Sequence, residues 1–392
     1  LRQANPTCSV PPRASDLLMI KKVEATFGYM QNKPIAKYTF QPEQPITAPI
    51  TTEIVGPDAE NVTIGFRLPG NKSKDVLLAD LVGQILTNGK AGLMDLNLVK
   101  KQKLLGASAS AFILIDYGVL FMQGRPTLGQ SLDDVKALML GEIENLKKGN
   151  FDDGLITSII NNQKKTKIQA SESYGSRAGD LMDAFTNELD WQEQVAYTEQ
   201  LSKLSKKDIV AFANKYFGDN YVVILKRKGE DKNIIKVEKP PITPVETNRD
   251  AQSAFVKQVN NMPATAVKPV WVDYNKDIQK AKIGPAEVLY VQNKDNSLFR
   301  LRYRFDMGTW NDKKLSLAAQ YLQFLSTDKM SAEDITKAFY KIACSFTVNA
   351  GPEFTTVTIE GLQENFTQAV NLFEDVLQNC TADETALKSL KS

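Results

Sequence analysis

Three arginines that alternate along one predicted strand are the first candidates for binding chemistry. Arg300, Arg302 and Arg304 are separated by Leu301 and Tyr303. Successive side chains of a strand point to opposite faces, so the three guanidinium groups are expected on one face. Guanidinium groups bind carboxylates through paired hydrogen bonds, which makes this face a candidate for contact with a peptide carboxylate or with acidic side chains. The alternative is an exposed face whose arginines pair with nearby acids.

Pairs of acidic residues are the second candidates, because two neighbouring carboxylates can act as a general acid and a general base. The pairs are Asp133 with Asp134, Asp152 with Asp153, and Glu142 with Glu144. Each pair lies at a predicted helix start or on a polar helical face. The helix dipole favours acids at a helix start without any catalytic role. The acidic pairs therefore predict no catalytic residue.

Histidine is absent from all 392 residues. A chain without imidazole has no ordinary zinc site, no Ser–His or Cys–His catalytic couple, and no unperturbed acid–base group near neutral pH. The three cysteines, Cys8, Cys344 and Cys380, are odd in number and widely spaced. They indicate neither a disulfide framework nor a zinc cluster, so we predict that this chain holds no metal.

The composition excludes further classes of protein. With 42% hydrophobic and 24% charged residues, the chain is typical of a soluble globular protein, and its length predicts two or three domains. A net charge of +2 indicates no nucleic-acid partner. No run of 18 apolar residues is present, so no membrane span is predicted. The compartment stays open between periplasm and cytoplasm.

Two stretches of the chain repeat one order of predicted elements: a strand, two helices, two strands and a helix. We match three pairs of segments between them: Ile64–Gly70 with Arg302–Gly308, Leu105–Phe112 with Ile342–Val348, and Phe121–Gly124 with Thr358–Gly361. The repeat predicts an α+β fold with two tandem homologous modules, each a mainly antiparallel sheet covered by helices. The first copy continues further beyond its last shared helix, so we expect the second module to be truncated.

The predicted domains follow from this repeat. The first domain is 1–228, with an irregular segment at 1–15; an inter-domain linker at 229–273 contains Lys239-Pro-Pro and a short helix; the second domain is 274–392, incomplete at its C-terminus. The last strand of the first domain, Tyr221–Lys226, is expected to be buried on both faces, because Val222–Leu225 are all apolar.

Four strings carry a resemblance to a known family: Lys22–Gly28, Gly89–Met94, Leu104–Ala111 and Leu204–Phe217. Together with the module order, they resemble the pitrilysin/insulinase family of zinc metallopeptidases, the inverzincins. That family is built from repeated α+β modules around a closed peptide-digesting chamber. The resemblance implies metallopeptidase/LuxS-like modules, the first of them the noncatalytic domain that follows a catalytic one.

The second module resembles the catalytic-type domain of this family. There, the helix after the glycine turn carries H-x-x-E-H, in which two imidazoles hold zinc and the glutamate activates water. The matching positions in this chain are Gln320, Gln323 and Phe324. Amides and a phenyl ring do not hold zinc tightly, and Gln323 cannot act as a base. The resemblance therefore implies a degenerate site, with no catalytic residue and no cofactor in this chain.

The sequence is thus interpreted as the noncatalytic portion of a zinc-dependent peptidase, forming the wall of a peptide-binding chamber. The parent protein would be a zinc metalloendopeptidase whose zinc lies in an N-terminal catalytic domain outside this sequence, and this chain alone is predicted to be inactive. The expected partners are a peptide substrate and the catalytic domain or an active subunit of the same family. Two alternatives stay open: an inactive partner subunit (pseudo-peptidase) of a heterodimeric peptidase, and a stand-alone binding or assembly module.

Overall fold

A computed structural model describes residues 14–31, 33–36, 38–231, 238–244, 247–263, 266 and 268–391. The chain divides into two compact units, residues 1–45 and 46–392. The first unit contains helix α1 (Ala14–Phe27), which ends where the N–H of Gly28 donates to the carbonyl of Glu24 at 2.8 Å. Residues 14 and 15 are therefore helical, not irregular as predicted, and the rest of that predicted segment lies outside the described residues.

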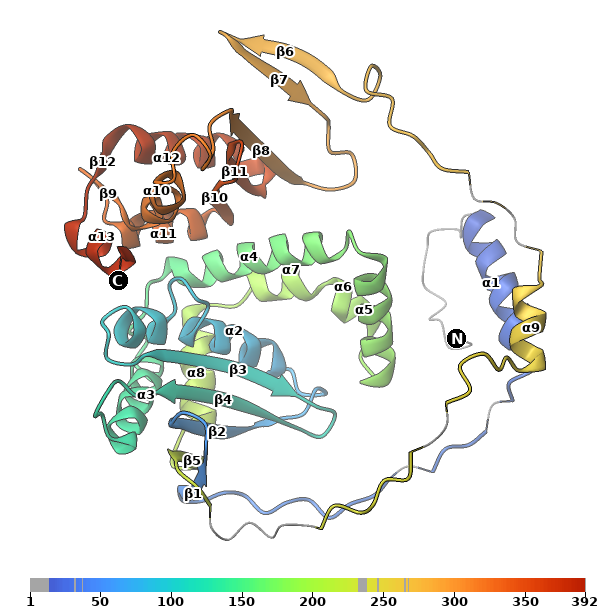
Figure 1. The fold of residues 1–392 in the computed structure, drawn as a ribbon. Coiled ribbons are helices and arrows are strands. Elements are labelled where there is room, and N and C mark those ends of the chain that lie inside the picture. Colours follow the sequence, from blue (N-terminus) through green and yellow to red (C-terminus); the bar gives the residue numbers. More distant parts are fainter. Residues whose placement is uncertain are drawn as a thin grey trace. The chain divides into compact units, whose positions relative to one another are not determined.

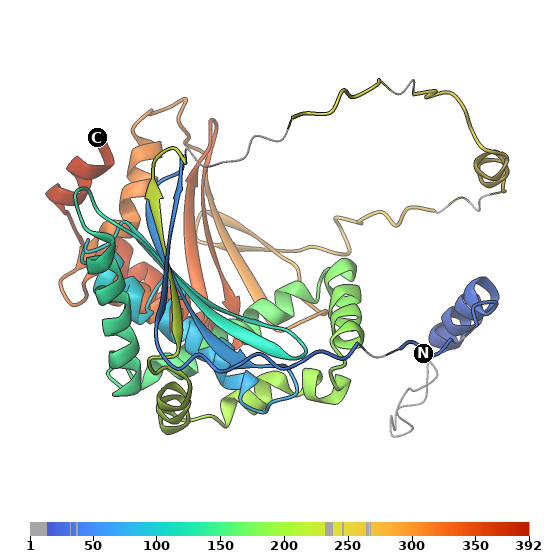
Figure 2. The ribbon, with the colours of Figure 1, turned by 90° about the horizontal axis from the view of Figure 1, so that it is seen from below.

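The second unit begins with a twisted five-stranded sheet (Figures 1 and 2). Its strand order is β1-β5-β2-β4-β3, and all neighbours are antiparallel except the parallel pair β1 and β5. The strands are β1 (Ile50–Gly56), β2 (Asn61–Pro69), β3 (Gly106–Ile113), β4 (Tyr117–Arg125) and β5 (Tyr221–Lys228). Together with the helices below, this sheet confirms the predicted α+β class.

Helices cover one face of this sheet and extend beyond it. The helical segments of this module are α2 (Val76–Leu86), the π-helical turn η1 (Asp95–Val99), α3 (Leu132–Lys147), α4 (Gly154–Ala170), α5 (Tyr174–Thr186), α6 (Trp191–Val195), α7 (Tyr197–Ser202) and α8 (Lys206–Tyr216). The core forms between the sheet and α2, α3 and α8. Every second residue of β2 is buried there, and Phe66 packs edge-on against Phe217 with ring centroids 5.0 Å apart.

One local prediction for this module is wrong. In β5, Val223 and Leu225 are buried but Ile224 is 37% exposed, so only one face of the strand is covered. This follows from a mainly antiparallel sheet with helices on one side only. The segment after α2 is helical at Leu93 and Met94 and continues into the turn η1, and the Asp95 carboxylate accepts backbone N–H groups of the turn that precedes it, including that of Gly89 at 2.8 Å.

The segment between the sheets contains one short helix and a separate hairpin. Helix α9 (Ala254–Asn260) begins at Ser253, whose hydroxyl accepts the N–H of Val256 at 3.2 Å. Strands β6 (Gln279–Ile283) and β7 (Ala286–Tyr290) then form a two-stranded antiparallel sheet. The short helix expected in the linker is therefore present.

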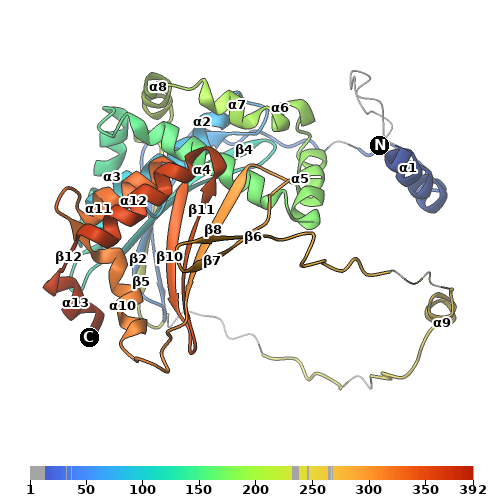
Figure 3. The ribbon, with the colours of Figure 1, turned by 90° about the horizontal axis from the view of Figure 1, so that it is seen from above.

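The second module contains a three-stranded antiparallel sheet of order β10-β11-β8, with α12 beside it (Figure 3). Its elements are β8 (Leu298–Phe305), α10 (Leu315–Tyr321), the 3-10 turn η2 (Leu322–Phe324), β9 (Ser326–Thr327), α11 (Ala332–Lys341), β10 (Cys344–Ala350), β11 (Thr355–Leu362), the 3-10 turn η3 (Gln363–Asn365), α12 (Phe366–Asn379), β12 (Cys380–Thr381) and α13 (Glu384–Lys391). Ile359 and Phe373 are buried at its core.

The two modules share one topology, which supports the predicted repeat. In each, the first strand pairs with the second strand of a hairpin, β2 with β4 and β8 with β11. The strand pairing corrects one predicted match. Val62 pairs with Gly124 and Phe299 pairs with Gly361, so Val62 corresponds to Phe299 and Ile64 to Leu301 rather than to Arg302. The arginines therefore occupy the face opposite to that of the buried β2 residues.

The long helix α4 joins the two modules (Figure 1). It packs against α11 of the second module. The side-chain amide of Asn162 donates to the carbonyl of Tyr340 at 2.6 Å, and Lys164 forms an ion pair with Glu364 at 3.3 Å. Among the described residues, no helix is both long enough and apolar enough to cross a membrane.

Candidate functional site

The three positions that match the H-x-x-E-H motif lie where α10 gives way to the turn η2. Gln320 is in the last turn of α10, and Gln323 and Phe324 belong to η2. Both glutamines line a cavity between the modules, whereas Phe324 is 41% exposed. This set offers neutral amides and a phenyl ring, so it does not fit zinc, which takes imidazole, thiolate or carboxylate ligands. Within the described ranges, no group of three or more His, Cys, Asp or Glu residues could hold a metal ion.

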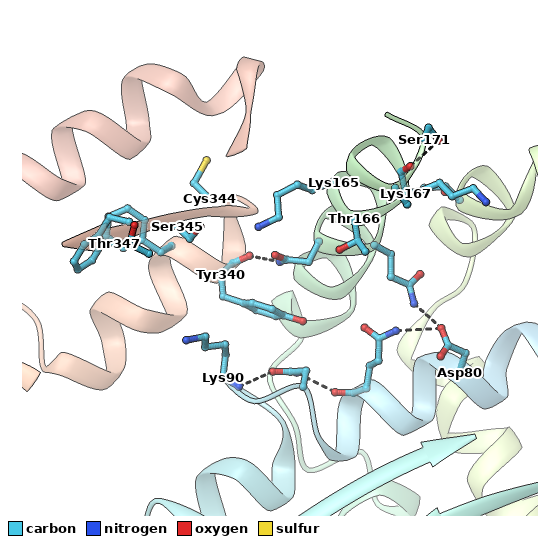
Figure 4. Close-up of a pocket in the computed structure, with 18 of the residues that line it drawn as sticks. Asp80, Lys90, Lys165, Thr166, Lys167, Ser171, Tyr340, Cys344, Ser345 and Thr347 are labelled. Carbon is cyan, nitrogen blue, oxygen red and sulfur yellow. Dashed lines mark hydrogen bonds between the residues drawn. The ribbon is translucent and has the colours of Figure 1, made fainter. Parts of the chain in front are cut away.

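The cavity has a volume of about 1510 Å³ and is walled by both modules. The first module contributes α2, the turn after it, and α4 to α7. The second contributes α10, η2, α11 and the strand β10 (Figure 4). Its size exceeds that of a typical small-molecule pocket, which is on the order of 300–1,000 Å³. A cavity of this size accommodates several residues of a peptide.

A hydrogen-bonded cluster around Asp80 forms one polar part of the wall. The Asp80 carboxylate accepts hydrogen bonds from the side-chain amides of Gln84 at 3.1 Å and Gln163 at 2.6 Å, and from the hydroxyl of Tyr197 at 3.2 Å. Burial raises the pKa of Tyr197 well above its usual value, and the neighbouring Asp80 charge adds to this effect. Tyr197 therefore stays protonated as a donor. The amide oxygen of Gln163 is buried, and it has no hydrogen-bond partner in the part of the chain that the structure describes.

The second module contributes two weakly acidic side chains to the wall, Tyr340 and Cys344. Burial raises the pKa of Tyr340 to about 12, and the Asp95 charge acts in the same direction. Burial also raises the pKa of Cys344 to about 11, although the nearby Lys165 ammonium opposes this shift. Both groups are therefore neutral near pH 7. Neither a phenolate nor a thiolate nucleophile is available in this wall.

Strand β10 presents its outer edge to the cavity. It pairs with β11 on one side only, and its residues from Cys344 to Val348 line the cavity. The corresponding edge strand of the first module is β3, where the Thr87 hydroxyl accepts the N–H of Ala109 at 2.7 Å and donates to its carbonyl at 3.0 Å. The strand pairing makes Phe346 the counterpart of Ala109 in the second module, and no side chain among the described residues forms such a bridge to its backbone.

The three arginines singled out in the sequence do lie together on the exposed face of β8. Arg300 forms an ion pair with Glu360 at 2.9 Å, and Arg304 forms one with Asp306 at 3.2 Å. The Arg304 guanidinium also lies over the Phe354 ring. None of the three arginines is among the described residues that line the cavity. The acidic pairs do not line it either, and Asp134 is bound by the helix-capping hydroxyl of Ser131.

Sequence reasoning did not find the cavity residues Asp80, Asn162, Lys165 and Tyr340. They come from three helices that lie far apart in the sequence, and no local spacing marks them. One weak signal was available. Polar residues recur along one side of α4, and on a surface helix such a side would be exposed to solvent. In the structure, part of this side faces the second module.

Comparisons with known proteins agree with this architecture. A model of the peptidase M16 inactive domain matches residues 18–163, and a model of insulinase (peptidase family M16) matches residues 315–392. The zinc protease PqqE of Helicobacter pylori is 26% identical over 185 residues, which cover 46% of this chain and 41% of that protein.

Two solved structures share the fold. A protease from Helicobacter pylori has a TM-score of 0.51 and 22% identity, with 54% of this chain and 52% of that chain covered. Pitrilysin has a TM-score of 0.51 and 16% identity, with 87% of this chain and 38% of that chain covered. The chain thus spans about half or less of the length of these relatives. The two family models together cover more than half of the chain, which therefore belongs to the pitrilysin/insulinase (M16) peptidase family, as its sequence strings predicted.

Proposed function

We propose that this chain is the noncatalytic portion of a zinc-dependent peptidase and forms part of the wall of a peptide-binding chamber. The first module matches the inactive domain of the family. The positions of the zinc motif in the second module hold Gln320, Gln323 and Phe324, which cannot hold zinc or activate water. Peptide hydrolysis would be performed by zinc in a catalytic domain outside this sequence, on the same polypeptide or on a partner subunit.

The observation that carries the proposal is the large cavity bounded by the open edge of β10. An extended peptide can add to such an edge as a further strand, with backbone hydrogen bonds providing affinity independently of side-chain sequence. In the first module, Ala109 directs its N–H and carbonyl away from β4, toward Thr87. The strand pairing makes Phe346 the counterpart of Ala109, so its backbone groups would be directed to the open edge.

The remaining wall suits a peptide rather than a compact polar ligand. Apolar side chains such as Leu181, Trp191 and Val195 line it together with the amides of Asn162 and Gln163. Apolar surface contributes on the order of 25 cal/mol per Å² buried, and a few polar groups fix orientation. This wall would therefore hold unfolded or extended segments while a catalytic domain acts on them.

The test is peptide binding by the purified chain, measured by fluorescence anisotropy with a short fluorescein-labelled apolar peptide whose C-terminus is amidated. The matched probe is the same peptide with alternate backbone nitrogens methylated, which removes the N–H groups needed for strand pairing but keeps the side chains. We expect saturable binding of the first peptide and about tenfold weaker binding of the second. Equal affinity for both peptides, or no binding of either, would contradict the proposal.

A further inference from the structure

Two lysines in the cavity wall form no ion pair with any acidic residue that the structure describes. Lys165 lies on α4, and Lys90 lies in the turn after α2. Neither forms an ion pair within the described residues, whereas Lys167, which also lines the cavity, is paired with Asp180 at 2.7 Å. Figure 4 shows Lys165 and Lys90 on either side of Tyr340, both pointing toward the side of the cavity where β10 lies.

The acidic groups of the same wall do not neutralise these two lysines. Asp80 already accepts three hydrogen bonds from uncharged donors, and Asp180 is engaged by Lys167. The third acidic residue of the lining is Asp183 on α5, and it forms no ion pair with either lysine within the described residues. Unpaired ammonium groups beside a partly apolar wall attract an anionic ligand more strongly than they would in open water.

Hydroxyl groups surround the same region. Tyr340, Ser345 and Thr347 line the cavity near Lys165 (Figure 4). The Tyr340 hydroxyl has no hydrogen-bond partner in the part of the chain that the structure describes. Because its pKa is raised by burial, it keeps its proton and can donate a hydrogen bond. An ammonium flanked by hydroxyl donors is a suitable partner for a carboxylate, whose two oxygens accept several hydrogen bonds.

Apolar groups occupy another part of the wall. Leu181 and Val195 line the cavity and are 56% and 70% exposed, and Trp191 joins them. Large apolar side chains left this accessible inside a cavity favour a ligand that also carries apolar side chains. The wall as a whole therefore complements a ligand with one anionic group and neighbouring apolar groups.

We propose that Lys165 and Lys90 bind a carboxylate of a peptide lying along β10, with the apolar side chains of that peptide against Leu181, Trp191 and Val195. This inference rests on the proposed function and adds a substrate class to it: apolar peptides that carry a carboxylate, either at the C-terminus or on an acidic side chain. The arginines on β8, which are not among the residues lining the cavity, play no part in this selection.

The test compares three unlabelled, N-acetylated peptides of one apolar sequence on the full chain by isothermal titration calorimetry. One has a free C-terminal carboxylate, one is amidated, and one is amidated with a single internal glutamate. We expect at least one carboxylate-bearing peptide to bind about tenfold more tightly than the neutral amide, with the difference shrinking as salt is added. The peptide that shows the gain identifies which carboxylate is recognised.

The variants locate the site. Lys165→Met combined with Lys90→Met should reduce the ratio of the affinities for the carboxylate-bearing peptide and the neutral amide from about tenfold to about one. Lys165→Arg should preserve the gain. The matched control is Lys203→Met, which removes one surface lysine outside the cavity. Circular dichroism melting curves establish that each variant is folded.

Failure of this inference is distinguishable from failure of the proposed function. Equal binding of all three peptides would overturn the carboxylate site but leave peptide binding intact. A carboxylate preference that persists in the double lysine variant would overturn the assignment to Lys165 and Lys90. Absence of binding by every peptide would contradict the proposed function itself.

Discussion

The side-chain hydroxyl of Thr87 bridges the backbone of Ala109, accepting its N–H at 2.7 Å and donating to its carbonyl at 3.0 Å. This pair closes part of the free edge of β3. The counterpart of Ala109 in the second module is Phe346, whose backbone no described side chain bridges, and β10 remains an unpaired edge within the described structure. One difference between two copies of a module thus leaves one edge occupied and the other open to an added strand.

Replacing Thr87 by valine should lower the free energy of unfolding by about 1–3 kcal/mol, because Ala109 then loses both hydrogen bonds at a partly buried position. The measurement is urea denaturation monitored by circular dichroism. Thr87→Ser keeps the hydroxyl and should lose only a fraction of this stability. Equal stability of wild type and Thr87→Val would show that the bridge contributes nothing.

Gly70 and Gly308 should both resist substitution, because they occupy equivalent places behind the two hairpins. A methyl group at Gly70 would overlap with the carbonyl oxygen of Ile115, and one at Gly308 with that of Pro352. Each Gly→Ala change should therefore cost about 1–3 kcal/mol or more. Gly141 in α3 has open space around it, so Gly141→Ala should stabilise the protein by about 0.5–1 kcal/mol. Thermal melting of the three variants tests the contrast, and similar Tm values for all three would refute it.

Stability should fall at acidic pH partly through Asp75. Its carboxylate accepts hydrogen bonds from Lys215 at 2.7 Å and Tyr216 at 2.6 Å, which hold its pKa below the usual value in the folded state. A group whose pKa is lowered by folding stabilises the protein above its unfolded pKa, about 3.9, and loses this contribution as pH falls through the folded pKa.

Asp75→Asn should therefore lower the urea midpoint near pH 7 and weaken its dependence on pH below about 4. Asp219→Asn is the control, because it removes an exposed aspartate with no ion pair in the described residues. If the urea midpoint of Asp75→Asn depended on pH in the same way as that of wild type, Asp75 would not contribute to the loss of stability at acidic pH.

The described cysteines should differ in reactivity. Cys380 is exposed, whereas Cys344 is buried and its pKa is raised to about 11. At pH 8 only about 0.1% of such a thiol is ionised, and the thiolate is the reactive form. With Cys8 replaced by serine, we expect Ellman's reagent to label Cys380 at least about 100-fold faster than Cys344, as measured in single-cysteine variants. Comparable labelling rates would mean that Cys344 is open to solvent as a thiolate.

Much of the fold was predictable because its signals are local. The alternation of Val62, Ile64, Phe66 and Leu68 identified a strand with one buried face, and the structure confirms it. The repeat was predictable from the order of the elements. Aligning Gly70 with Gly308, however, shifted β2 by one residue relative to its counterpart β8. Gly308 does correspond to Gly70 in its contact with a hairpin turn. The strand pairing shows that Gly308 lies nine residues after Phe299, whereas Gly70 lies eight residues after the equivalent Val62.

The cavity could not be predicted from the sequence, for a physical reason. Its wall forms where α4 meets α11, and the bond from Asn162 to the Tyr340 carbonyl joins residues 178 positions apart. No periodicity within either helix indicates which of its polar residues will face the other module. The alternating arginines were visible because their spacing is local, and the structure places them on a face with acidic neighbours instead of in the cavity.

The central claim is that this chain contributes a binding wall and not a catalytic zinc site. The most direct test is a calorimetric zinc titration of the purified chain, run beside a peptide-cleavage assay with and without a chelator. The account predicts no stoichiometric zinc binding and no cleavage, because Gln320, Gln323 and Phe324 provide neither ligands nor a base. Tight one-to-one zinc binding with cleavage that the chelator abolishes would contradict it.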